Sequence, residues 1–181
     1  LGWVGRLLAT REAGALKRLS GIPGVPKLIG RWGATGIVRD YIEGRTLSPK
    51  KHVPDDFHER LRKLIEAIHA RGMAYVDLEK CENVLVGDDG RPYLFDFQVA
   101  WYLPRRWGGE LLPARMLRNW LQAGDRYHLI KQQRRTRPVR DRAGEFGPVV
   151  QRPDLNPAFR SCGQRELRAV RAQARRGIEV R

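Results

Sequence analysis

The densest group of chemically active side chains lies in the stretch YVDLEKCENVLV, residues 75–86. Asp77, Lys80 and Asn83 fall close together in it, and a run suited to a buried strand follows at once. Carboxylate and amide oxygens are ligands that Mg²⁺ prefers, and a carboxylate can also accept a proton from a hydroxyl group. The stretch is therefore either a crowded polar turn or a site of catalysis.

A predicted β-hairpin brings a further carboxylate to this stretch. A short strand begins at Asn83, GDDG at 87–90 forms a tight turn, and the returning strand ends near Asp96. Antiparallel pairing places the outer ends of the two strands side by side, so Asn83 and Asp96 should emerge together beside Asp77. Such a group suits Mg²⁺ bound with phosphates, with one carboxylate left to accept a hydroxyl proton.

The elements that must position these side chains are read from hydrophobic periodicity and turn residues. They are, in chain order, a helix over 3–20, strands near 27–31 and 36–42, a loop over 45–54 and a helix from about 55 to 72. The second helix has the clearer pattern, because Phe57, Leu61 and Ile68 lie on one apolar face. The catalytic stretch is thus predicted between a long helix and a small hairpin.

The second half of the chain is predicted to be helical and then irregular. Leu112, Met116 and Trp120 share one face of a helix, which is interpreted as a core helix, with a membrane-surface helix as the alternative. Residues 125–135 form a second helical run. Beyond it the sequence is rich in Arg, Pro and Gly with weak periodicity, which is typical of irregular chain, apart from a basic helix predicted over 164–176.

Composition limits the classes of protein that fit this sequence. The 181 residues are 41% hydrophobic and 30% charged, which is typical of a globular protein. No apolar run reaches the length of a membrane span, and the first residues make a poor secretory signal. Cys81 and Cys162 lack metal-ligand spacing, so a reducing, cytoplasmic setting is favoured over a disulfide framework.

The net charge of +15 is concentrated toward the C-terminal end. Residues 1–130 hold 21 Lys and Arg against 15 Asp and Glu, whereas residues 131–181 hold 14 against 5. Such a bias favours anionic partners: acidic lipid, phosphorylated small molecules or nucleic acid. Nucleic acid is the least favoured, because the tail has few aromatic side chains for base stacking and no known motif. A solvated basic tail is the plainer interpretation.

The catalytic stretch resembles the protein-kinase-like superfamily. An aspartate loop, an asparagine that opens a hairpin and an Asp-Phe pair form the signature of that superfamily, and here they read YVDLEKCEN and LFDFQ. The helix with Glu12 is similar to the αC helix, IVRDYIEG to the hinge that carries adenine, and LIEAIHARG to the helix before the catalytic loop. The resemblance covers about residues 5–130 and is closest to bacterial lipopolysaccharide-kinase-like and RIO-like serine/threonine kinases.

The resemblance implies an α+β, kinase-like fold and ATP:Mg²⁺-dependent phosphoryl transfer to a hydroxyl acceptor. Its parts would be an N-lobe remnant over 1–44, a compact, mainly helical C-lobe over 45–135 and a basic, partly disordered tail over 136–181. The acceptor would be a protein Ser/Thr or a lipopolysaccharide-type sugar. The protein would be cytoplasmic, and the Arg-rich tail offers a contact with anionic lipid at the inner face of the membrane.

Roles in the chemistry follow from the resemblance residue by residue. Asp77 would be the catalytic base, and Lys80 would touch the transferred phosphate. Asn83 and Asp96 would hold Mg²⁺.

The resemblance assigns nucleotide contacts as well. The backbone of Asp40 and Ile42 would meet adenine, and Glu12 would pair with the strand lysine that grips the α- and β-phosphates. No glycine-rich loop and no such lysine precedes Glu12, and Lys17 and Lys27 are poor substitutes. The resemblance thus implies a fragment that lacks its first N-lobe strands and has weak or no activity alone. The alternative is a pseudokinase that acts as a binding or scaffold module through its basic tail.

Three positions depart from the family pattern. Tyr75 and Val76 stand where a His-Arg pair is usual, so control by an activation-loop phosphate is not expected. Gln98 replaces the glycine of Asp-Phe-Gly, which stiffens the segment but leaves the metal ligand in place. No Ala-Pro-Glu segment follows, so the peptide-docking part of a protein kinase is not evident.

Overall fold

The computed structural model describes residues 2–49, 51–103 and 112–136. In these residues the chain forms three α-helices, one 3₁₀ helix and seven short strands, which pair in three small antiparallel sheets. The α+β class expected from the sequence is confirmed. The predictions for the tail, including the basic helix over 164–176, lie outside the described residues.

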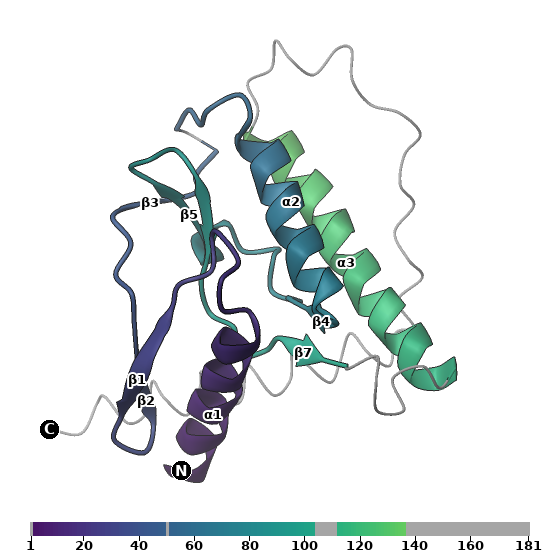
Figure 1. The fold of residues 1–181 in the computed structure, drawn as a ribbon. Coiled ribbons are helices and arrows are strands. Elements are labelled where there is room, and N and C mark those ends of the chain that lie inside the picture. The colour runs from purple at the N-terminus through teal and green to yellow at the C-terminus, as the bar shows by residue number, and fades with distance from the viewer. Residues whose placement is uncertain (1, 50, 104–111, 137–181) are drawn as a thin grey trace, which may run out of the picture. The chain divides into compact units, whose positions relative to one another are not determined.

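The N-terminal elements are a helix and a two-stranded sheet in contact (Figure 1). α1 (Gly2–Arg18) is followed by Gly21, whose φ of 84° is left-handed and turns the chain away from the helix. β1 (Leu28–Trp32) and β2 (Gly36–Arg39) pair antiparallel beside α1. β2 ends at Arg39 rather than at residue 42, because residues 40–42 leave the sheet to cross toward the next strand.

The predicted hairpin is present, and it has a third strand. β5 (Val84–Gly87) and β6 (Pro92–Leu94) pair antiparallel. β3 (Gly44–Thr46) pairs with the other edge of β5, so the prediction of a loop over 45–54 is wrong at its start. Three residues without apolar alternation carry no strand signal of their own. The unpaired edge of β5 supplies the hydrogen bonds that extend them.

Two long helices pack side by side (Figure 1). α2 (Phe57–Ala70) buries its predicted apolar face, and Phe57, Leu61 and Ile68 are fully buried. Where two helical runs were predicted, the structure has one continuous helix, α3 (Leu112–Thr136). Gly124 lies inside it, because the cost of about 1 kcal/mol for a glycine in a helix is small beside the packing of the whole helix.

The buried face of α3 is not the predicted one. Leu112 and Met116 are each 66% exposed, so the apolar stripe assigned to the core does not enter it. The buried positions recur every three or four residues and are mostly polar: Arg118, Gln122, Asp125, Leu129, Gln132 and Thr136. Polar side chains are buried only where they find hydrogen-bond partners. The burial of this polar stripe is therefore explained by its hydrogen-bond partners, which lie in several neighbouring segments.

A short strand and a 3₁₀ turn lie at the two ends of the loop that begins at Tyr75. β4 (Met73–Ala74) comes just before it and pairs with β7 (Trp101–Tyr102), and a 3₁₀ turn (Cys81–Asn83) ends it at the start of β5. Leu78, from inside the loop, is wholly buried in the same core as α2. Among the described helices, none combines enough length with enough apolar character to cross a lipid bilayer.

Candidate functional site

The loop over residues 75–83 is anchored by a carboxylate of α3. Asp125 is only 1% exposed and accepts hydrogen bonds from the backbone N–H of Tyr75 at 2.8 Å and of Val76 at 2.7 Å. Val76 has a φ of 73°, which is rare for a β-branched residue, and the bond to its N–H helps to hold this conformation. Nε2 of His69 donates to the same carboxylate at 2.8 Å.

Two glutamines of α3 support the backbone on either side of this anchor. Nε2 of Gln122 donates to the carbonyl oxygens of His69 and Met73, at 3.2 and 3.1 Å. Nε2 of Gln132 donates to the carbonyl oxygen of Leu78. A loop has no neighbouring strand to satisfy its buried backbone groups, so side chains must do so. Asp125 and Gln132 of the polar stripe thus hold the loop, and Gln122 holds the chain that leads into it.

The structure brings three predicted site residues together at one carboxylate. Nζ of Lys80 forms an ion pair with Oδ2 of Asp77, and Nδ2 of Asn83 donates to the same oxygen at 2.9 Å. Nδ2 of Asn83 also donates to the backbone carbonyl of Asp77 at 3.1 Å. Among the described residues no hydrogen bond reaches Oδ1 of Asp77, and its side chain is 19% exposed. One oxygen is held in place and the other can accept a proton.

Asp96 lies next to this group, as the hairpin predicts. The backbone N–H of Phe95 donates to the carbonyl of Asn83 at 3.0 Å, which places the two outer ends of the hairpin side by side. Asp96 follows directly with a left-handed φ of 59°, and its Oδ1 lies 3.4 Å from the backbone nitrogen of Gln98. This turn takes Asp96 out of the line of β6.

The donor set at Asn83 and Asp96 fits a hard cation. The amide nitrogen of Asn83 is committed to Asp77, which leaves its amide oxygen as a candidate ligand in addition to the carboxylate of Asp96. In the part of the chain that the structure describes, no three His, Cys, Asp or Glu side chains gather as metal ligands. Two protein oxygens are enough for Mg²⁺ that is bound together with phosphates. Asn83 and Asp96 are therefore the two described residues of this region whose side-chain oxygens could hold such a cation.

Glu12 of α1 reaches the same region and is 7% exposed. Its Oε2 accepts a hydrogen bond from Nε2 of Gln98 at 3.2 Å, and its Oε1 lies 3.9 Å from Nη1 of Arg39. The pKa of the Glu12 carboxyl is raised, mainly because burial disfavours its charged form, and the charge of Asp96 adds to this. The hydrogen bond from Gln98 and the charge of Arg39 act in the opposite direction. Glu12 thus has an arginine of β2 as its cationic neighbour.

The segment predicted to meet adenine links β2 to β3. The backbone N–H of Asp40 donates to the carbonyl of Lys27 at 2.9 Å, which ties the start of the segment to the first hairpin. Within the described residues Ile42 forms no backbone hydrogen bond, and Tyr41 beside it is 87% exposed. Of the two residues predicted to meet adenine, Ile42 is therefore the one whose backbone is not already bonded to another described backbone group.

Tyr75 is wholly buried and stands where the resemblance expects histidine. Its hydroxyl donates to the carbonyl of Phe95, and its ring meets that of Phe97 edge-on with 5.1 Å between the centroids. Burial, with a further contribution from three nearby aspartates, raises the pKa of the hydroxyl well above its usual value. The hydroxyl therefore stays a neutral donor that fixes the segment before Asp96.

Replacing Tyr75 with phenylalanine is expected to lower the free energy of unfolding by about 1 to 2 kcal/mol, because the part-buried Phe95 carbonyl loses its donor. Urea denaturation measures this loss. The matched control is Tyr93→Phe, whose hydroxyl donates to the exposed Asp89 at 2.9 Å and should matter by less than about 0.5 kcal/mol. Equal losses in the two variants would contradict a specific role for the Tyr75 hydroxyl.

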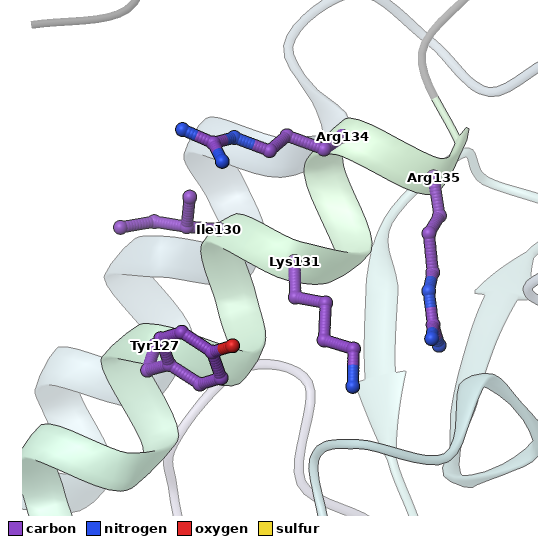
Figure 2. Close-up of a pocket in the computed structure, with 5 residues that line it drawn as sticks. All are labelled: Tyr127, Ile130, Lys131, Arg134 and Arg135. Atoms are coloured by element: carbon purple, nitrogen blue, oxygen red, sulfur yellow. The ribbon is translucent and has the colours of Figure 1, made fainter. Parts of the chain in front are cut away.

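A basic pocket lies along α3 close to the loop. Its volume is about 190 Å³, and it is lined by Tyr127, Ile130, Lys131, Arg134 and Arg135. Figure 2 shows these side chains on successive turns of the helix. Nζ of Lys131 lies 2.5 Å from Oε1 of Glu79, and this bond lowers the pKa of the Glu79 carboxyl. The pocket thus presents positive charge next to the loop that carries Asp77.

The residues that hold the loop in place were not predicted from the sequence. Periodicity predicts only helical runs around Gln122, Asp125 and Gln132, and a strand that contains Arg39. A signal for the first three exists: polar residues recur in α3 at helical spacing, opposite apolar residues that turn out to be exposed. Arg39 has no such signal, because its significance depends on Glu12 and Phe95, which are distant in the sequence.

Comparisons with known proteins do not place this chain in a family. No model of a known protein family matches it. A search of curated proteins also found no match.

Proposed function

We propose that this chain binds ATP with Mg²⁺ and transfers the γ-phosphoryl group to a hydroxyl acceptor, with weak or no activity because no glycine-rich loop and no strand lysine precede Glu12. The observation that carries the proposal is the hydrogen bonding of the Asp77 carboxylate. One of its oxygens is held by Lys80 and Asn83, the other is open, and Asp96 lies beside this group. A positioned carboxylate next to an oxygen-lined cation site is what phosphoryl transfer to a hydroxyl requires.

In the proposed reaction Oδ1 of Asp77 accepts the proton of the acceptor hydroxyl as the hydroxyl oxygen bonds to the γ-phosphorus. The bond between that phosphorus and the oxygen shared with the β-phosphate breaks, and ADP leaves with the electron pair. Lys80, already paired with Asp77, balances negative charge on the phosphoryl group in transit. Catalysis of this kind rests mostly on positioning and charge stabilisation.

Asn83 and Asp96 would hold the metal in this proposal. Mg²⁺, when bound, neutralises charge on the β- and γ-phosphates. Asn83 has two tasks, because its amide nitrogen orients Asp77 while its amide oxygen is left for the cation. The base and the cation site are therefore coupled through one side chain.

The proposal includes a kinase-like fold, whose N-lobe remnant would span 1–44 and whose C-lobe would span 45–135. It is supported by the order of the described elements: a helix with Glu12, a strand pair, a linking segment, a long helix, the Asp77 loop and the hairpin. A protein Ser/Thr or a lipopolysaccharide-type sugar is the proposed acceptor, in the cytoplasm or at the inner face of the membrane.

Exchanging Asp96 for asparagine tests the proposed function. Asparagine tolerates the left-handed backbone at this position and removes only the charge. Calorimetric titration should show ATP binding that requires Mg²⁺ in the unaltered chain and is at least about tenfold weaker in Asp96→Asn, since a charged metal ligand is lost. Asp88→Asn, in the exposed turn of the same hairpin, is the matched control and should bind ATP as the unaltered chain does.

Mg²⁺-independent binding, or equal affinity in the unaltered chain and Asp96→Asn, would contradict the assignment. The second candidate function, a pseudokinase binding module for anionic partners, is favoured by the basic pocket on α3. It predicts salt-sensitive binding to vesicles that contain acidic lipid, and this binding would survive the Asp96 change.

A further inference from the structure

We infer that Arg39 supplies the cation that grips the phosphates of a nucleoside triphosphate in this chain, in place of the strand lysine that the sequence lacks. The inference rests on the proposed function and names one residue of its nucleotide site. The described residues place the Arg39 guanidinium between Glu12 and the segment that ends in Asp96.

Two contacts define the position of Arg39 at the end of β2. Its guanidinium carbon lies 4.5 Å from the centroid of the Phe95 ring, and Nη1 lies 3.9 Å from Oε1 of Glu12. Phe95 directly precedes Asp96, so the stacking brings the cation near the proposed metal ligand. Ile37, two residues earlier on the same strand face, packs against the core, which shows that this face of β2 points inward.

The guanidinium of Arg39 has hydrogen-bonding capacity that the described residues leave unused. Nη1 is fully buried and has no hydrogen-bond partner among them, because 3.9 Å to Glu12 is too long for a hydrogen bond. A buried donor without an acceptor costs free energy, and a phosphate oxygen would remove that cost. A planar guanidinium also matches two phosphate oxygens at once, which an ammonium group does not.

Other cations near Glu12 are less suited to this role. Arg11 also approaches the segment after Asp96, but its donors are engaged by the carbonyl oxygens of Gln98 and Ala100, each at 3.1 Å. Lys80 is paired with Asp77. Without Arg39 the phosphates would meet the carboxylates of Glu12, Asp77 and Asp96, and the other two cations described here, Arg11 and Lys80, already have partners.

The test is calorimetric titration of the full chain with ATP·Mg²⁺ and, separately, with adenosine, which has no phosphates. Arg39→Met keeps the aliphatic stem over Phe95 and removes the charge, so it should weaken ATP binding about tenfold to hundredfold. Its affinity for adenosine should change by less than about threefold. Arg39→Lys should recover part of the ATP affinity, because it keeps the charge but not the planar fork.

Arg31→Ala is the matched control. Arg31 lies on the paired strand β1, and its guanidinium donates to the hydroxyl of Thr10 at 3.0 Å, so its loss should leave ATP affinity unchanged. Unchanged ATP binding in Arg39→Met would overturn the inference and leave the proposed function standing. Equal losses for ATP and adenosine would also overturn it and mark a structural role. An unaltered chain that binds neither ligand would overturn the proposed function and this inference together.

Discussion

Replacing Asp125 with alanine is expected to lower the free energy of unfolding by about 3 to 5 kcal/mol. The carboxylate is buried and receives hydrogen bonds from the backbone N–H of Tyr75 and Val76 and from Nε2 of His69. Alanine would leave all three donors without an acceptor in the protein interior. Urea denaturation followed by tryptophan fluorescence gives the loss directly.

Two further variants serve as a control and as an intermediate case for Asp125→Ala. Asp88→Ala removes an exposed turn carboxylate and should change the free energy of unfolding by less than about 0.5 kcal/mol. Asp125→Asn keeps one acceptor oxygen but turns an amide N–H toward the donors. Its loss in free energy of unfolding should therefore be smaller than that of Asp125→Ala and larger than that of Asp88→Ala. A loss below about 1 kcal/mol for Asp125→Ala would show that α3 does not hold the loop in place.

The second large effect is expected at Gly44, where the linking segment joins β3. Its φ of 153° disfavours a side chain, and an added Cβ would lie 2.8 Å from Cα of Gly87 and collide with the carbonyl oxygen of Val86. Both neighbours are backbone of β5, which leads directly from Asn83. Strain and overpacking together should make Gly44→Ala less stable by about 2 to 4 kcal/mol, as measured by urea denaturation.

Gly30→Ala is the control for this comparison. Gly30 lies in β1, and an added Cβ there has no neighbour within 4 Å, so alanine should be neutral or stabilise the chain by up to about 1 kcal/mol. If Gly44→Ala and Gly30→Ala unfolded at the same urea concentration, the close approach of Gly44 to β5 would not matter for stability. A loss confined to Gly44→Ala would show that the stability of the β5–β6 hairpin depends on the close approach of the linking segment.

The sequence predicted the elements whose signals are local. α2 follows from the spacing of Phe57, Leu61 and Ile68, and the β5–β6 hairpin follows from its GDDG turn. These two elements are enough to predict that Asn83 and Asp96 lie side by side near Asp77, because antiparallel pairing fixes which ends meet.

The parts that depend on distant partners could not be predicted in this way. β3 forms because it pairs with the free edge of β5, and the residues of Gly44–Thr46 have no pattern that predicts a strand. α3 turns a polar stripe inward because the loop and other buried segments offer hydrogen-bond partners there, whereas apolar periodicity selects the exposed Leu112 and Met116. The position of Arg39 against Glu12 likewise results from the packing of β2 on α1.

The anchoring of the loop by α3 also has a consequence for the order in which the molecule assembles. Tyr75 and Asp125 are separated by 50 residues, so during synthesis the loop emerges well before the carboxylate that fixes it. A contact of such separation forms only after the entropy cost of closing a long loop has been met, which slows it relative to local contacts. The amide protons of Tyr75 and Val76 should therefore exchange with deuterium until α3 docks, and their later protection reports the moment at which the site becomes ordered.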